Sequence, residues 1–172
     1  VLLAKVNRKL CDDFGLGYYY IVWLTSEAQG LSPLHDYRWN RKLGHGGFGV
    51  VHLVVNKHTD EQCALKIIRV EQPAKGTQAE AMKKACSEIQ LHQKAAKASV
   101  HVVNLLVWGQ AGGSFLFCVM EFCAGGDLRQ YVRKGEGIVD RKQAWTWFRE
   151  ILVGLVAIHA EGIVHLDLKP EN

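Results

Sequence analysis

Residues 164–172 (Val-His-Leu-Asp-Leu-Lys-Pro-Glu-Asn) bring three polar side chains close together in the sequence. Pro170 fixes one of its own backbone angles and keeps Lys169 out of the helical region, so the segment is predicted to be a loop that can aim side chains. In such a loop Asp167 could accept a proton from an alcohol, Lys169 could hold a phosphate oxygen, and Asn172 could offer a metal ion a carbonyl oxygen. The alternative is a plain polar turn after a buried helix, and this segment alone does not decide between the two.

The composition is that of a globular chain of one domain, with 172 residues, 48% of them hydrophobic and 22% charged. The net charge is +4, but the cations are scattered among acidic residues, which argues against a nucleic-acid surface. The five cysteines form no Cys-x-x-Cys pair, so neither a disulfide framework nor a zinc site is predicted, and a reducing intracellular, cytoplasmic location is expected. The longest apolar run, residues 14–24, is too short for a membrane span.

Residues 1–36 show no recognisable chemistry, although residues 18–23 are aromatic and β-branched and suit a strand. Residues 43–55 follow the pattern of a strand, a glycine loop and a second strand, in which backbone N–H groups can approach an anion. The alternatives are a plain hairpin and the dinucleotide-binding fingerprint. The fingerprint is disfavoured because residues 50–55 are short and β-branched where a helix would have to begin.

Lys66 interrupts a third apolar strand, residues 62–68, so it either reaches out of an edge strand or pairs with a carboxylate in a cleft. The following helix is predicted from Thr77 to Ala98, because Thr77 and Glu80 make a capping box. Glu88 lies at the margin of the apolar face of this helix and could turn toward a neighbouring sheet. For an arbitrary glutamate, a solvated helix surface is the simpler interpretation.

Two more strands, at residues 101–108 and 114–120, are predicted to join through Gly112-Gly113 and to complete a five-stranded antiparallel sheet carrying one helix. Residues 121–126 are expected to leave this sheet as an extended linker. Two capped helices are predicted to follow, one from Asp127 through Arg133 and one from Asp140 to about Glu161. The second helix is apolar on nearly all sides, which predicts a place within a helical layer.

Taken in order, the glycine loop, Lys66, Glu88, Asp127 and residues 165–172 resemble the eukaryotic protein kinases over roughly residues 37–172. The resemblance implies an α+β, protein-kinase-like fold. Residues 37–124 would form a small antiparallel-sheet N-lobe with one helix and the hinge. Residues 125–172 would begin a helical C-lobe, and residues 1–36 would be an N-terminal extension of unknown role. The cofactors implied are ATP, in the cleft between the lobes, and Mg²⁺.

The resemblance also assigns roles to single residues. Lys66, paired with Glu88, would hold the α- and β-phosphates of ATP. Asp167 would orient and deprotonate the substrate hydroxyl, Lys169 would steady the transferring phosphate, and Asn172 would bind Mg²⁺. The other residues expected around ATP are Leu43, Gly44, His45, Gly46, Gly47, Phe48 and Gly49 over the phosphates, Val51 and Ala64 above the adenine, Met120 behind it, Glu121 and Cys123 at its edge, and Asp127 at the ribose.

Lys169 within Asp-Leu-Lys-Pro-Glu-Asn resembles the serine/threonine kinases, so the implied partner is a protein substrate with a Ser or Thr acceptor. Leu166 stands where the family usually carries an arginine, a variant also seen in myosin-light-chain-type kinases. The family's Asp-Phe-Gly metal segment is expected beyond residue 172, and the 172 residues alone are expected to be inactive. The alternative is a pseudokinase, which would keep the fold as a nucleotide-binding or scaffolding module and transfer no phosphate.

Overall fold

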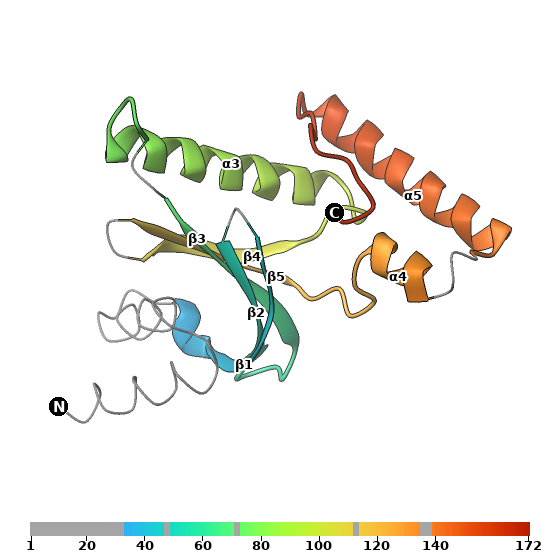
Figure 1. The fold of residues 1–172 in the computed structure, drawn as a ribbon, viewed down its shortest axis with the longest axis horizontal. Helices are drawn as coiled ribbons and strands as arrows, with labels where there is room; N and C mark the ends of the chain where they lie inside the picture. Colours follow the sequence, from blue (N-terminus) through green and yellow to red (C-terminus); the bar gives the residue numbers. More distant parts are fainter. Residues whose placement is uncertain (1–32, 47–48, 71–72, 112–113, 135–138) are drawn as a thin grey trace. The chain divides into compact units, whose positions relative to one another are not determined.

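The computed structural model describes residues 33–46, 49–70, 73–111, 114–134 and 139–172 (Figure 1). The strand predicted at residues 18–23, the tip of the glycine loop (Gly47 and Phe48) and the glycine pair at 112–113 lie outside these ranges. The described elements are η1 (Pro33–Asp36), β1 (Tyr37–Gly46), β2 (Gly49–Asn56), β3 (Gln62–Arg69), α3 (Gln78–Ala98), β4 (Leu105–Ala111), β5 (Phe115–Glu121), α4 (Leu128–Lys134) and α5 (Arg141–Ala160).

The chain divides into two units, which are described here one at a time. The first unit holds the described residues up to Ser87 together with residues 106–120, and therefore η1, β1 to β3, the first half of α3 and nearly all of β4 and β5. The second unit holds residues 88–105 and 121–172, and therefore the second half of α3, both α4 and α5, and the polar loop that ends the chain.

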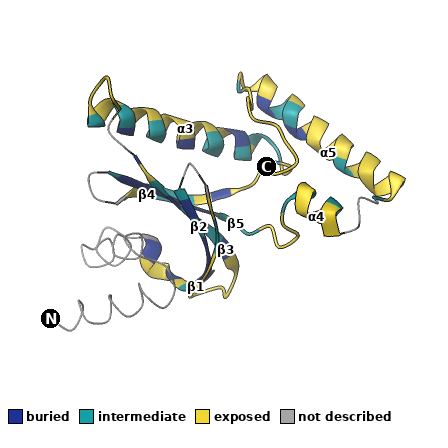
Figure 2. Ribbon diagram, viewed as in Figure 1, coloured by how far each residue is buried: buried dark blue, intermediate teal, exposed yellow. Residues whose placement is uncertain are grey.

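The first unit is built on one five-stranded sheet in the order β1-β2-β3-β5-β4, in which β1, β2 and β3 pair antiparallel. Burial alternates along β3, so that Cys63, Leu65 and Ile67 are buried while Ala64 and Lys66 are only half-buried (Figure 2). Successive side chains of a strand point to opposite faces, so one face of β3 belongs to the core and the other is partly open. The core cluster on the closed face consists of Leu34, Tyr37, Val54, Cys63, Leu65, Ile67, Phe115, Phe117 and Val119.

The α+β class and the five-stranded sheet expected from the sequence are confirmed. The capping box is also confirmed, because the backbone N–H of Thr77 donates to the Glu80 carboxylate at 2.8 Å and the N–H of Glu80 donates to Thr77 Oγ1 at 3.2 Å. These two bonds satisfy N–H groups that the first turn of α3 would otherwise leave unpaired. The predicted helix therefore begins where its cap residues place it.

One predicted strand begins later than expected. Residues 101–108 were expected to be extended throughout, but β4 starts only at Leu105. The preceding backbone groups have other partners: the Val102 N–H donates to the Ser99 carbonyl at 3.2 Å, and the Val103 carbonyl lies 2.8 Å from the ring Nε2 of His92. A backbone already paired in this way is not available to a sheet ladder. The linker at residues 121–126 is likewise not extended throughout, since it turns at Ala124-Gly125.

Helix α5 is exposed along most of its length within the described part of the chain. Among its residues only Gly154 and Ile158 are buried, whereas Trp145 is 61% exposed and Phe148 is 52% exposed (Figure 2). Within the described part of the chain, the apolar sides of α5 are therefore not covered as a place inside a helical layer would require.

His52 on β2 is a buried side chain of unusual chemistry. It is 1% exposed, its ring centroid lies 3.9 Å from that of Trp39, and neither ring nitrogen has a hydrogen-bond partner among the described residues. Burial lowers the pKa of His52 from 6.5 to about 4, and the charge of Lys42 on the paired strand acts in the same direction. The ring is therefore neutral in the folded chain at neutral pH.

This lowered pKa predicts acid-sensitive stability. Between pH 6.5 and about pH 4 the unfolded chain binds a proton at His52 while the folded chain does not, so stability falls as the pH falls. At roughly 1.4 kcal/mol per pKa unit, the full loss is roughly 3 kcal/mol. Urea unfolding at pH 7.5 and pH 4.5 should show that His52→Leu removes most of this loss, whereas His159→Leu, at an exposed position of α5, retains it. An unchanged pH dependence in His52→Leu would contradict this explanation.

Candidate active site

The glycine loop is a tight connection between β1 and β2. Gly46 pairs with Gly49 and Gly44 pairs with Val51, so the two strands are in register from Gly44 to the loop. Gly49 has a φ of +125°, and a Cβ atom there would lie 2.0 Å from the Ile67 carbonyl oxygen, so only glycine fits. At Gly44, by contrast, a Cβ would meet no atom of the described residues within 4 Å, so packing against them does not explain the glycine at position 44. Leu43 lies at an irregularity of the β1–β2 pairing, and His45 pairs with Val50.

Lys66 lies on the partly open face of the sheet together with two other predicted site residues. Val51 is its direct partner across the strand pair, and Ala64 is two positions away on β3, so all three share one face. The pKa of the buried Cys118 thiol on β5 is raised to about 11 by burial, and the Lys66 ammonium acts in the opposite direction. The cation therefore lies near Cys118, and Met120 follows Cys118 on the same face of β5 by the strand period.

The hinge residues Glu121 and Cys123 belong to the second unit. The Glu121 N–H donates to the Asn104 carbonyl at 3.0 Å, and its carboxylate accepts the Asn104 N–H at 3.0 Å. The Glu121 carbonyl is therefore the backbone group that this residue could offer to an adenine. The Cys123 carbonyl accepts the Gly126 N–H at 3.1 Å, which leaves the Cys123 N–H as the corresponding donor.

Helix α5 ends in a motif that directs the chain into the polar loop. The Gly162 N–H donates to the His159 carbonyl and the Ile163 N–H donates to the Ile158 carbonyl, each at 2.9 Å, with Gly162 at a φ of +72°. This is the Schellman arrangement, which needs a left-handed residue just after the helix and is usually closed by glycine. The chain therefore leaves α5 at Gly162 in a defined direction, three residues before His165.

Asp167 is the centre of the loop's hydrogen bonds. Its Oδ2 accepts from Lys169 Nζ at 2.8 Å and from Asn172 Nδ2 at 2.9 Å, while its backbone carbonyl accepts from the same Asn172 amide at 2.7 Å. All three predicted loop residues are exposed. The hydrogen bond from Lys169, followed by that from Asn172, lowers the pKa of Asp167 below its ordinary value, so the carboxylate is ionised at neutral pH. The structure therefore brings together the three side chains that the sequence analysis singled out, and their roles remain predictions.

Helix α4 anchors the far end of the loop. The Arg129 N–H donates to the Pro170 carbonyl at 3.1 Å, and the Arg129 guanidinium forms an ion pair with Glu171. Asp127 caps α4, and both of its oxygens accept from Gln130, at 2.7 Å from the backbone and 2.6 Å from the side chain. Asp127 could therefore contact a ribose only with a carboxylate whose two oxygens already accept hydrogen bonds from Gln130.

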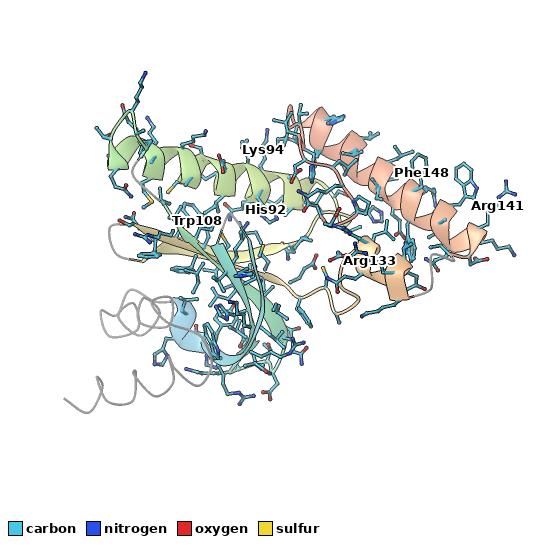
Figure 3. The ribbon with its side chains drawn as sticks, viewed as in Figure 1. His92, Lys94, Trp108, Arg133, Arg141 and Phe148 are labelled. Carbon is cyan, nitrogen blue, oxygen red and sulfur yellow. The ribbon has the colours of Figure 1, made fainter. Side chains whose placement is uncertain are left out.

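Glu88 begins the part of α3 that belongs to the second unit, and it is exposed. Further along α3 lies Lys94 (Figure 3). It forms an ion pair with Glu161 at 3.0 Å and also donates to the Glu161 carbonyl at 2.8 Å, which connects this helix to the end of α5. Lys66 belongs to the first unit, so the predicted pairing of Lys66 with Glu88 remains a prediction.

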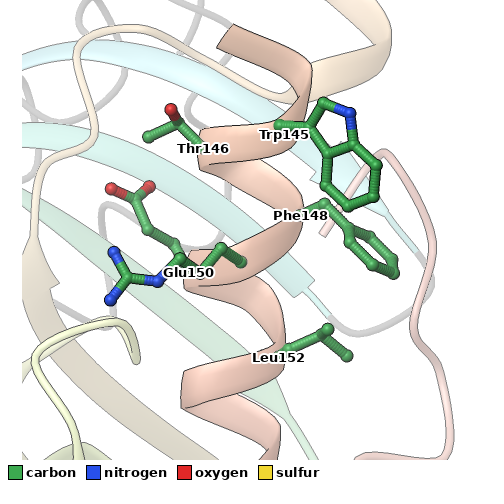
Figure 4. A pocket seen from close by; sticks show the side chains of 6 residues that line it. Trp145, Thr146, Phe148, Glu150 and Leu152 are labelled. Carbon is green, nitrogen blue, oxygen red and sulfur yellow. The ribbon is translucent and has the colours of Figure 1, made fainter. Parts of the chain in front are cut away.

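A shallow hollow on α5 contains none of the predicted site residues. The hollow is lined by residues of this helix alone, and Trp145, Phe148 and Leu152 project from one side of the helix (Figure 4). The hollow lacks any convergent set of polar groups like that around Asp167, so it is not the candidate active site.

Comparison with known proteins identifies the family. Residues 37–172 match the protein kinase domain family. The chain belongs to the protein kinase family. It is 34% identical over 141 residues to Protein kinase C-like 1 of Candida albicans, and 32% identical over 146 residues to the cAMP-dependent protein kinase catalytic subunit of Arthrobotrys oligospora. It is also 30% identical over 130 residues to the serine/threonine-protein kinase grp of Drosophila melanogaster.

These matches cover most of this chain and a small part of each relative. They include 81%, 84% and 76% of the chain, but only 12%, 27% and 24% of the three relatives. The matched kinase domain region contains every predicted site residue from Leu43 to Asn172.

One functional candidate of the kinase family was missed by the sequence analysis. The tripeptide Asp13-Phe14-Gly15 has the composition of the family's metal-binding segment, but it stands before the glycine loop instead of after Asn172. It lies outside both the described residues and the matched region. A search for Asp-Phe-Gly anywhere in the sequence, and not only after Asn172, would have found this tripeptide.

Proposed function

We propose that the polypeptide carrying this sequence is an ATP-dependent serine/threonine protein kinase, which transfers the γ-phosphoryl group of ATP to a hydroxyl of a protein substrate. The observation that carries the proposal is the Asp167 carboxylate, which is exposed and is kept ionised by Lys169 and Asn172 in a chain of the protein kinase family.

Asp167 fits the role of proton acceptor in this reaction. The substrate oxygen attacks the γ-phosphorus, the bond from the γ-phosphorus to the bridging oxygen breaks, ADP leaves, and the hydroxyl proton passes to Asp167. A carboxylate with a lowered pKa is a weak base, so it contributes chiefly by orienting the hydroxyl and by accepting the proton late in the reaction. Its exposure leaves room for a protein substrate to reach it.

Two lysines are suited to the phosphate charges. Lys169 lies 2.8 Å from the Asp167 carboxylate, so its ammonium would lie beside the transferring phosphoryl group if Asp167 contacts the substrate hydroxyl. Lys66, on the partly open face of β3, would hold the phosphates nearer the nucleoside. Each cation would stabilise charge on the phosphoryl oxygens in the transition state.

Asn172 is the described residue best placed to hold Mg²⁺. Its amide nitrogen donates to Asp167, which leaves Oδ1 as the oxygen available to a metal. Mg²⁺ prefers six oxygens in octahedral geometry, and no cluster of three acidic, His or Cys side chains occurs in the described ranges. Phosphate oxygens, water and a further carboxylate would have to complete the coordination. The chemistry that the bound ion supplies is neutralisation of phosphate charge.

Asp13 is our candidate for that carboxylate, on the strength of the Asp-Phe-Gly tripeptide alone. Asp13→Asn is expected to raise the Mg²⁺ concentration needed for half-maximal turnover by about tenfold or more, because Asn is a weaker ligand than a carboxylate. Asp12→Asn, one residue away, is the matched control and should leave it unchanged. Equal Mg²⁺ requirements in Asp13→Asn and the unmutated protein would assign the ligand to another residue.

The serine/threonine preference is supported by Lys169 and by the name of one relative, the serine/threonine-protein kinase of Drosophila melanogaster. The test is transfer from γ-labelled ATP to three peptides that differ only in a Ser, Thr or Tyr acceptor. The proposal expects label on the Ser and Thr peptides. Label on the Tyr peptide alone would overturn the preference.

A scaffolding pseudokinase is the competing function. Such a protein would bind nucleotide and label none of the three peptides.

We also propose an intracellular location, which is supported by the described cysteines, since Cys63, Cys86, Cys118 and Cys123 are all free thiols. No helix within the described ranges is long and apolar enough to cross a membrane.

A further inference from the structure

The polar loop at the end of the chain is anchored to a short helix that carries cations and no acidic residue. Helix α4 has the sequence Leu-Arg-Gln-Tyr-Val-Arg-Lys. Arg129, in its first turn, donates its backbone N–H to the Pro170 carbonyl at 3.1 Å and forms an ion pair with Glu171. Residues four positions apart lie on the same face of a helix, so Arg133 follows Arg129 along the side of α4 that contacts the loop.

The acidic residues around this helix are already engaged. The Glu171 carboxylate is paired with Arg129. Both carboxylate oxygens of Asp127 accept hydrogen bonds from Gln130, at 2.7 and 2.6 Å. Asp140 is the N-cap of α5, and its side chain accepts a backbone N–H of the first turn at 3.0 Å. None of these three carboxylates is therefore free to attract a basic segment of a substrate.

Four cations of the same region, by contrast, have no ion-pair partner among the described residues. We call them the basic band, and they are the exposed residues Arg133 and Lys134 at the end of α4 and Arg141 and Lys142 at the start of α5 (Figure 3). The rings of Tyr131 and Trp147 meet edge to face with their centroids 5.0 Å apart, which joins α4 to the first half of α5. The basic band therefore continues from one helix to the other.

The basic band is within reach of a protein segment whose acceptor hydroxyl lies at Asp167. Glu171 comes four positions after Asp167, which limits the distance between their Cα atoms to about 14 Å. One helical turn, about 5.4 Å along the axis, separates Arg129 from Arg133. An extended peptide advances about 3.3 Å per residue, so side chains about five to eight positions from the acceptor could contact the basic band.

We propose that the protein substrate is acidic, and that carboxylate side chains flanking the acceptor bind the basic band, with Arg133 and Lys134 as specificity-determining residues. The inference rests on the proposed function, since it names the substrate class of that same site. An arginine offers a carboxylate two parallel N–H donors, and a lysine offers a point charge. The contacts of Arg129 make the band continuous with the loop that carries Asp167, which favours a substrate segment over a separate surface such as an anionic membrane.

Three peptides test the substrate class. They share a central serine and differ only in their flanking residues, which are Glu, Gln or Lys. For the polypeptide that carries this sequence, kcat/KM should be at least about tenfold higher for the Glu-flanked peptide than for the Lys-flanked peptide, because several exposed charge pairs contribute together. The preference should shrink as salt is added, since salt screens exposed charges. Equal kcat/KM values for the peptides, or a preference for the Lys-flanked peptide, would overturn the proposal.

Charge reversal assigns the preference to α4. The double variant Arg133→Glu and Lys134→Glu should favour the Lys-flanked peptide, and a misfolded protein would not gain activity toward a new peptide. The milder double variant Arg133→Gln and Lys134→Gln should reduce the preference for Glu to within about threefold, and it decides the test if the reversal unfolds α4. The matched control is Lys83→Glu with Lys84→Glu, at exposed positions of α3, which should keep the original preference. An unchanged preference in the variants of Arg133 and Lys134 would overturn the proposal.

The last measurement does not depend on phosphoryl transfer. The same peptides with alanine in place of serine are labelled with a fluorophore, and their Kd values are measured by anisotropy. The Glu-flanked peptide should bind at least about fivefold more tightly than the Lys-flanked one, and the reversed variant should invert this order. If no serine peptide is phosphorylated but this ranking holds, the proposed function fails and the recognition of acidic segments stands. If all serine peptides are phosphorylated and bound equally well, the proposed function stands and this inference fails. A reversed variant that loses binding to phosphatidylserine vesicles while its peptide ranking stays unchanged would assign the band to a membrane and overturn the proposal.

Discussion

Replacing Asp167 with asparagine is expected to lower kcat by about 100- to 10 000-fold, the range that a positioned general acid or base typically contributes. Asparagine keeps the size of the side chain and can still accept a hydrogen bond from Lys169, which lies 2.8 Å from the carboxylate in the native loop. It cannot take the proton of the substrate hydroxyl. Steady-state rates at saturating ATP and peptide measure the loss directly.

The Asp167→Asn variant should otherwise resemble the unmutated protein. Asp167 is exposed, so its thermal unfolding and its affinity for ATP should change little. The control is Asp140→Asn, at the exposed N-cap of α5, because asparagine caps a helix about as well as aspartate. Turnover by Asp167→Asn within about threefold of the Asp140→Asn control would remove Asp167 from the chemistry.

Lys66→Met is expected to lower kcat/KM for ATP by about 100- to 1000-fold, comparable to the loss of one preorganised group that stabilises transition-state charge. Methionine preserves much of the length of the side chain on the partly open face of β3 and removes the ammonium. The phosphates then lose a cation, while the core face formed by Leu65 and Ile67 is untouched. Fluorescence titration with ATP and steady-state kinetics would show where the loss falls.

The comparison for this variant is Lys84→Met, at an exposed position of α3, which should leave both kinetic constants unchanged. A further check comes from Cys118, whose pKa the nearby Lys66 ammonium lowers against the stronger effect of burial. Loss of that ammonium should make the Cys118 thiol react still more slowly with alkylating reagents. Normal ATP kinetics in Lys66→Met would contradict the assigned phosphate contact.

Local sequence signals predicted the parts of the fold whose causes are themselves local. The apolar run of residues 62–68, interrupted by Lys66, predicted β3, and the Thr77–Glu80 box predicted the start of α3. Asp140 capped α5 as expected, through its bond to the Gln143 N–H. In each case neighbouring residues in the sequence decide the structure.

Features that depend on distant partners were predicted less well. The apolar letters of residues 101–104 suited a strand, but His92, eleven positions earlier, lies against the Val103 carbonyl instead. The apolar pattern of α5 predicted neighbours without showing where they lie, and Trp145 is 61% exposed in the structure. The φ of +61° at Leu166 was not predicted from the sequence, because leucine seldom adopts a positive φ.

The site residues also separate into features with local causes and features that depend on distant residues. The proline-containing loop drew attention to Asp167, Lys169 and Asn172 because they are close in the sequence, and the structure joins them by hydrogen bonds. The anchoring of that loop by Arg129, some forty positions away, has no local signal. The tripeptide Asp13-Phe14-Gly15 was not considered in the sequence analysis, and a metal-binding role for Asp13 is a proposal.

The central claim is that the ionised Asp167 takes part in phosphoryl transfer, and one experiment tests it most directly. The polypeptide that carries this sequence and its Asp167→Asn variant are each given γ-labelled ATP, Mg²⁺ and a serine peptide. The affinity for ATP is measured on the same samples. We predict equal ATP affinities and a rate of peptide labelling that is lower in Asp167→Asn by about 100-fold or more. Equal labelling by the two proteins, or ATP binding by the native polypeptide with no labelling at all, would contradict the account.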